Sequence, residues 1–223
     1  MYLNLEAFMR LRGFLLSAVV AVPAGHAAFG GWAVVTVENP PERLTVGVPY
    51  TLEYSVRQHG KELLPGLDGR VEAKAGGKVV TAAARPLSAG KYFAVLTVPS
   101  GGSWTITVHS GFGPSKTEMK PIAAAVQGAP VVAMSEPERG EHLFNAKGCA
   151  TCHVEMKVIP VDVRSTKYDE KFVRQLLADP AAMPKRHKAG VEMPNLSLKP
   201  GEIAALAAYL SGAGPGPNSS GTR

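Results

Sequence analysis

Residues 92–109 have the sequence YFAVLTVPSGGSWTITVH, which is two β-type runs separated by a turn. Tyr92–Val98 and Trp104–His109 are rich in Val, Thr and aromatic residues, which favour strands. Pro99–Gly102 supplies the turn between them. Similar short runs recur upstream between Gly- and Pro-rich turns, at Ala33–Glu38, Tyr50–Val56, Val71–Ala75 and Val79–Ala83. The pattern predicts an all-β, Ig-like sandwich over residues 29–112.

The chain changes character after this region. Residues 113–135 contain three prolines among small residues, which favours a linker. Ser135 and Glu138 form a capping-box pattern that predicts a helix running toward Lys147. Further helices are expected from Asp169 and from Pro200, the last with one apolar stripe. We therefore predict an all-α domain over 136–212, followed by a disordered tail at 213–223.

The N-terminus has the three-part layout of a secretory signal peptide. Arg10 and Arg12 precede the apolar run Phe14–Val22, and Gly25–Ala27 offers a cleavage site. We expect residues 1–28 to be this signal, with an uncleaved membrane anchor as the alternative. Either form places the remainder of the chain outside the cytoplasm, in a periplasmic or other extracytoplasmic location.

Composition and charge narrow the function classes. With 45% apolar and 19% charged residues, the chain is globular rather than disordered. Its formal charge of +6 comes from 24 basic and 18 acidic side chains that are scattered along the sequence. No basic stripe with interleaved aromatic residues is present, so nucleic acid is not an expected partner. The net positive charge favours, at most, a partner protein with an acidic surface.

The two cysteines of the chain lie in the sequence Cys149-Ala-Thr-Cys152-His153. This C-x-x-C-H pattern is typical of covalent haem c attachment: the thiols add to two vinyl groups of the porphyrin, and His153 becomes the proximal iron ligand. A thioredoxin-type redox pair would need a βαβ context. A structural zinc site would need four ligands, and no further cysteines exist.

A methionine is the expected sixth ligand of the iron. Met193 lies in a proline-stiffened loop before the last helix, whereas Met156 is too close to His153 in sequence to reach the opposite haem face. Met183, also followed by proline, is the second candidate. Ligation by His153 and Met193 would raise the reduction potential and leave no open coordination position. This favours an electron carrier over an enzyme.

Residues 136–211 resemble a class I cytochrome c domain. The resemblance rests on Arg139–Phe144 before the haem motif, on Leu176–Pro194 with its terminal Met-Pro, and on Ile203–Leu210. It implies a cytochrome c fold in which Gly140 gives room for Tyr209 where the first and last helices cross. It also implies that the Pro160 region supplies the carbonyl that orients His153. Lys199 departs from the Ser or Thr favoured at a helix N-cap.

The β region is similar, at the level of pattern, to YtkA-like and FixH-like domains, through Thr45–Val56, Gly90–Val98 and Trp104–Val108. Such domains are linked to copper or oxidase assembly, but fold analogy does not establish a function. The soft ligands available for copper are His59, His109, Met119 and Met134, and isolated residues of this kind are more often structural. The expected role of the sandwich is docking.

These observations predict an exported protein with one haem c that passes single electrons to redox partner proteins. A respiratory or photosynthetic membrane complex is the expected setting. The alternative to an electron carrier is a protein of another functional class: a haem-based sensor or oxidase-assembly factor in which the sandwich docks a partner. A haem peroxidase or oxidase would need an open iron or a second haem, and only one C-x-x-C-H is present.

Overall fold

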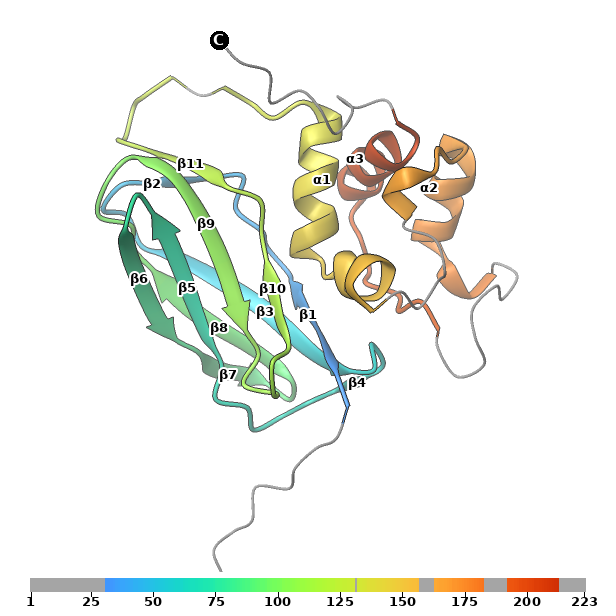
Figure 1. Cartoon of the computed structure of the whole chain (residues 1–223), viewed down its shortest axis with the longest axis horizontal. Helices are drawn as coiled ribbons and strands as arrows, with labels where there is room; N and C mark the ends of the chain where they lie inside the picture. The colour runs from blue at the N-terminus through green and yellow to red at the C-terminus, as the bar shows by residue number, and fades with distance from the viewer. Residues whose placement is uncertain (1–30, 131, 157–162, 183–191, 213–223) are drawn as a thin grey trace, which may run out of the picture.

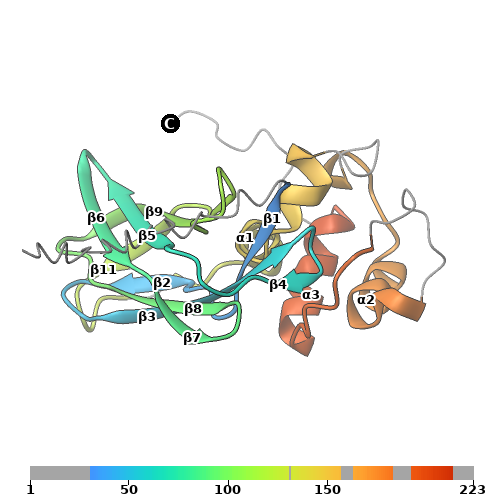
Figure 2. The same ribbon diagram turned by 90° about the horizontal axis from the view of Figure 1, so that it is seen from below.

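The computed structural model describes residues 31–130, 132–156, 163–182 and 192–212. These residues are predominantly β-structure, arranged as two sheets, with a few short helices gathered at one end (Figure 1). The view from below shows the strands and the helices side by side, with β1 next to α1 (Figure 2).

The first sheet has the strand order β1-β3-β8-β7, with β4 paired to β3. The bounds of its strands are Ala33–Val37 (β1), Tyr50–Gln58 (β3), Glu62–Leu63 (β4), Arg85–Ser88 (β7) and Lys91–Leu96 (β8). The second sheet has the order β2-β11-β9-β5-β6, with β10 paired to β9. Its strands are Arg43–Thr45 (β2), Arg70–Ala75 (β5), Lys78–Ala83 (β6), Gly102–His109 (β9), Lys116–Glu118 (β10) and Ile122–Ala125 (β11). The pairing of β2 with β11 is parallel, and the other pairings are antiparallel.

The main hydrophobic core lies between the two sheets, and we call this two-sheet body the sandwich. Alternate residues of each strand point inward, and Trp104, Tyr54 and Tyr92 are the largest side chains buried there. The segment predicted as a linker instead contributes two strands, β10 and β11. Met119 and Ile122 from that segment are 2% and 1% exposed in the core, so it belongs to the sandwich.

Strand β1 is an edge strand that is buried on both faces. Ala33, Val35 and Val37 point into the sandwich core, whereas Val34 is 3% exposed and lies outside it. The free edge of β1 is also occupied, because Ser115 Oγ accepts a hydrogen bond from the Ala33 amide and Thr117 Oγ1 donates one to the Val35 carbonyl. An edge strand with a buried outer face needs a covering layer, and the helices provide it.

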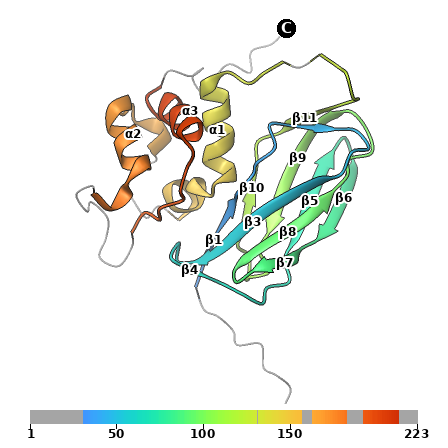
Figure 3. The same ribbon diagram turned by 180° about the vertical axis from the view of Figure 1, so that it is seen from behind.

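The helices are short. Their bounds are Glu136–Ala146 (α1), Glu170–Ala178 (α2) and Pro200–Leu210 (α3), with a π-helical turn at Thr151–Glu155 and 3-10 turns at Val163–Ser165 and Pro180–Ala182. The capping box of Ser135 and Glu138 is confirmed at the start of α1. Helix α1 lies between the sandwich and α3, and α2 lies farthest from the sheets (Figure 3). No helix among the described residues is long and apolar enough to span a membrane.

The predicted fold class, an Ig-like sandwich followed by a separate all-α cytochrome c domain, is wrong. The chain is predominantly β, and its three short helices do not form an independent all-α domain. Ala146 of α1 is buried in the core of the sandwich, and the helices keep only a small apolar cluster of their own. The predicted resemblance to class I cytochrome c and to YtkA-like or FixH-like domains is wrong as well: helical periodicity is present, but the helices are few and short among the described residues, and Ala146 of α1 joins the sandwich core.

Helix α1 buries a histidine against the sandwich. His142 is 1% exposed, and neither of its ring nitrogens makes a hydrogen bond of ordinary geometry to another described residue. Desolvation lowers the pKa of His142 below its usual value of 6.5. The nearby Glu42 carboxylate and Pro41 carbonyl oppose this shift without overcoming it. The imidazole is therefore held neutral in the folded chain.

We expect the folded chain to lose stability as pH falls through about 6.5. Below that value the unfolded chain binds a proton on His142 that the folded chain does not, so the unfolding free energy decreases with decreasing pH. Denaturant titrations between pH 7.5 and pH 5 should show a shallower decrease for His142→Leu. The pKa of His109 is also lowered, but this residue is common to both proteins and cancels in the comparison. Equal slopes for the two proteins would contradict the assignment.

Candidate functional site

The C-x-x-C-H segment follows directly on the end of α1. Lys147 is the C-cap residue, and Gly148 then adopts a φ of +77°, which reverses the chain and directs it into the next turn. Cys152 and His153 lie in the π-helical turn, where the Met156 amide donates to the Thr151 carbonyl over 2.9 Å. Single π turns of this kind occur frequently at functional sites.

Both thiols of this segment are kept in the protonated form. Burial raises the pKa of Cys149 to about 12, and the neighbouring Cys152 adds to the shift. Burial also raises the pKa of Cys152 to about 11, with Glu155 contributing. A dithiol redox enzyme or a catalytic cysteine needs a lowered thiol pKa, because the thiolate is the nucleophile. The burial that raises both thiol pKa values therefore disfavours the thioredoxin-type alternative.

The helices enclose a small apolar cluster that extends to the site. Its buried members are Leu143, Phe144, Val163, Val173, Leu177, Ala205, Leu206 and Ala207. Cys149, Val154 and Met193 pack against this cluster while staying partly exposed, and the ring of His153 lies 6.4 Å from that of Phe144. The structure thus brings the cysteine segment and Met193 to one apolar cluster, although they are more than 40 positions apart in the sequence.

The side chains gathered here are chemically suited to hold a covalently bound haem. Two thiols, an imidazole and a thioether are the donor set that such a group requires. The cluster is incompletely covered. Among the described residues, its buried side chains are surrounded by apolar side chains that are only partly buried. An apolar macrocycle seated there would complete the burial of this surface.

The remaining predicted residues fall in different places. Gly140 lies against α3, where an added Cβ would overlap the carbonyl of Ala205 and the Cβ of Tyr209. The Tyr209 ring packs 5.8 Å from that of Phe144. Pro160 and the alternative ligand Met183 lie outside the described residues. No group of three or more His, Cys, Asp or Glu side chains that could hold a metal ion occurs in the described part of the chain.

The candidate copper ligands of the sandwich lie in surroundings that favour a structural role over metal binding. Met119 is buried in the sandwich core, and the ring of His59 packs edge-on against Trp32 at 5.5 Å. His109 lies on β9, where it pairs in register with Arg70 and Lys116 on the neighbouring strands. Two cations beside His109 disfavour a bound metal ion.

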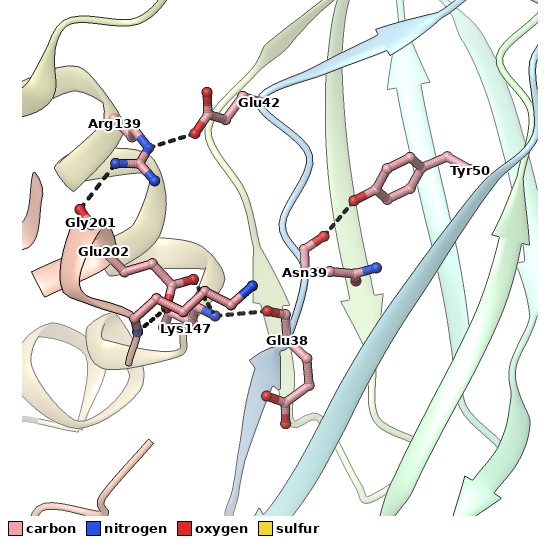
Figure 4. Close-up of polar contacts among 9 residues, drawn as sticks. Glu38, Asn39, Glu42, Tyr50, Arg139, Lys147, Gly201 and Glu202 are labelled. Carbon is pink, nitrogen blue, oxygen red and sulfur yellow. Dashed lines mark hydrogen bonds and ion pairs between the residues drawn. The ribbon is translucent and has the colours of Figure 1, made fainter. Parts of the chain in front are cut away.

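A buried ion pair joins the site to the sandwich, and the sequence did not predict it (Figure 4). Lys147 Nζ lies 2.9 Å from Glu202 Oε1 of α3 and also donates to the Glu38 carbonyl, at 2.9 Å, just beyond β1. The side chains of Lys147 and Glu202 are 4% and 10% exposed. Glu202 Oε2 in turn accepts from the Lys199 amide at the start of α3, which is the half of a capping box that the residue at N3 supplies.

A second connection lies at the outer end of the same interface. Arg139 of α1 forms an ion pair with Glu42 and donates to the Gly201 carbonyl at 3.0 Å (Figure 4). Lysine and arginine at helix positions are usually solvated, so nothing in their local sequence distinguishes Lys147 and Arg139 from surface residues. Only the folded chain shows that each contacts both α3 and the sandwich.

Comparisons with known proteins do not supply a family. No family model matches the chain, and no curated protein matches it. Among solved structures, similarity was found to the Lin-41 filamin domain (15% identity, TM-score 0.32, 44% of this chain and 86% of that one). Two larger proteins also match: the surface-layer protein SbsC (19% identity, TM-score 0.32, 44% of this chain) and the alpha-2-macroglobulin of Escherichia coli (15% identity, TM-score 0.35, 41% of this chain). This chain spans only 13% and 6% of those two proteins, and similarity at these TM-scores supports no inference about fold or function.

We expect Lys147→Met to lower the unfolding free energy by about 3–5 kcal/mol, because it leaves the Glu202 carboxylate buried without its partner. The double variant Lys147→Met/Glu202→Gln should recover part of this loss, since the amide oxygen can still accept from Lys199. The matched control is Lys120→Met, which removes an exposed ion pair with Glu141 and should cost less than about 1 kcal/mol. Equal losses for Lys147→Met and Lys120→Met in chemical denaturation would contradict this prediction.

Proposed function

We propose that this chain is an exported electron-transfer protein that carries one covalently bound haem c. The observation that carries the proposal is the convergence of Cys149, Val154 and Met193 on one partly covered apolar cluster, beside His153. The raised thiol pKa values support it further, because they disfavour the competing dithiol redox chemistry.

Each residue of the site has a distinct part in this proposal. The thiols of Cys149 and Cys152 would hold the group covalently as thioethers. The imidazole of His153 and the thioether of Met193 would hold its iron. The bound group supplies the one-electron couple, and the apolar cluster excludes water from its surroundings.

The iron-ligand set bears on the choice between electron transfer and catalysis. If His153 and Met193 both held the iron, the protein itself would supply both of these ligands, which favours an electron carrier over oxygen or peroxide chemistry. The proposed location is outside the cytoplasm, as the signal-like segment at residues 1–28 predicts. The proposed partners are redox proteins, including a respiratory or photosynthetic membrane complex, with a preference for acidic surfaces.

Expression together with a haem-attachment system should yield protein with one covalent haem per chain. Pyridine haemochrome analysis of the denatured protein measures it, and the reduced spectrum should show sharp α and β bands. Cys149→Ala/Cys152→Ala should retain no haem through denaturation. Absence of covalent haem from the unmodified protein would refute the proposed function. Haem that is attached but binds carbon monoxide readily would favour the sensor alternative.

Met193→Ala should remain a haem protein with a lowered reduction potential, because a thioether ligand raises it. The oxidised protein should also lose its weak sulfur-to-iron charge-transfer band in the far red. Met156→Ala is the matched control, since Met156 is 40% exposed and near His153 in sequence, and it should leave both properties unchanged. An unchanged potential in Met193→Ala would transfer the ligand assignment to Met183.

A further inference from the structure

The outer face of β1 and the turn that joins β3 to β4 lie next to the two segments that would hold the iron ligands. Val34 is buried, yet it belongs neither to the core of the sandwich nor to the apolar cluster of the helices. One of its methyl groups, Cγ1, faces Gly148, the residue directly before Cys149, and the other, Cγ2, faces Gly60. Val34 therefore lies between the attachment segment and the turn that joins β3 to β4.

The contact of Gly148 with β1 is too close to admit a side chain. A Cβ at this position would lie 2.7 Å from Val34 Cγ1 and would also overlap the Val35 carbonyl oxygen. That carbonyl is itself fixed, because Thr117 Oγ1 donates a hydrogen bond to it at 2.9 Å. Lys147, one residue earlier, is anchored to the Glu38 carbonyl. The start of the C-x-x-C-H segment is thus held against β1 at two successive residues.

The Met193 segment lies next to Gly60 of the β3–β4 turn, which also adjoins Val34. A Cβ built on Gly60 would lie 3.8 Å from Val34 Cγ2 and 4.0 Å from Cγ and Cδ of Pro194. Gly60 is buried and has a φ of +76°. The ring of Pro194, the residue directly after Met193, accordingly packs next to the β3–β4 turn. The sandwich therefore contacts the residues that adjoin Cys149 and Met193.

We infer that Val34 and Gly60 of the sandwich are positioning residues for the sixth iron ligand. They set the distance between the segment bearing Cys149 and His153 and the segment bearing Met193. This inference rests on the proposed function, and it gives the sandwich a part in the redox site in addition to any docking. Without this support, Met193 would remain the iron ligand but would dissociate from the iron more readily.

The test is imidazole binding to the oxidised haem protein, because imidazole competes with Met193 for the iron. Val34→Ala removes two methyl-sized groups from the support and should bind imidazole about tenfold more tightly than the unmodified protein. Val37→Ala is the matched control: it makes the same change on the same strand, but Val37 points into the core of the sandwich. It should lower stability without changing imidazole affinity.

A second pair of variants tests the contact between the β3–β4 turn and Pro194. This pair remains informative if Val34→Ala does not fold. Asparagine tolerates a positive φ, so Gly60→Asn and Gly66→Asn both keep the backbone conformation. At Gly60 the new side chain meets Val34 and Pro194, whereas at Gly66 nothing lies within 4 Å of an added Cβ. Gly60→Asn should increase imidazole affinity and weaken the charge-transfer band, and Gly66→Asn should do neither.

The outcomes separate the inference from the function beneath it. If the unmodified protein carries no covalent haem, or if Met193→Ala has the same charge-transfer band as the unmodified protein, the proposed function or ligand is wrong. Suppose instead that the haem is attached and that Met193→Ala loses the charge-transfer band. If Val34→Ala and Val37→Ala then bind imidazole with equal affinity, and Gly60→Asn matches Gly66→Asn, the positioning role of the sandwich is overturned. Increased affinity confined to Val34→Ala and Gly60→Asn supports it.

Discussion

The burial of β1 on both faces is the constraint on which the rest of the structure depends. Its inner residues close one edge of the sandwich core, and Val34 on its outer face lies under the segment that carries the cysteines. An edge strand ordinarily presents one face and one edge to solvent. Here side chains from the β10 region occupy the edge, and the helices cover the face. The helices therefore pack against the sandwich at this edge, where α1 contacts β10 and Gly148 contacts β1.

The polar contacts at this interface add specificity to an otherwise apolar junction. Lys147 connects the end of α1 to Glu202 of α3 and to the backbone after β1, and Arg139 makes a parallel connection nearer the start of α1. Burying an ion pair gains little net stability, but a misaligned helix would leave a buried charge unpaired. The pair thus favours one register of α1 against the sandwich over its alternatives.

Local sequence predicted the elements better than their assembly. Alternation and turn residues located the strands around Tyr92 and Trp104, and a capping pattern located the start of α1. The strands at Lys116–Glu118 and Ile122–Ala125 were missed because each is too short to show a period and a proline lies between them. Three of the four proposed haem-binding residues, Cys149, Cys152 and His153, were predicted from one contiguous motif. Lys147 and Val34 were not predicted, because their partners are distant in sequence, as the 109 positions between Lys147 and Glu38 illustrate.

The covered outer face of β1 also has a consequence for how the chain is made. Synthesis proceeds from the N-terminus, so the strands are complete before the residues of α1 and α3 exist. During that interval the edge of β1 is already satisfied by Ser115 and Thr117, but Val34 on its outer face lacks its cover. Exposed apolar surface of this kind favours association with other chains. By covering it, the C-terminal part of the chain protects the sandwich from self-association.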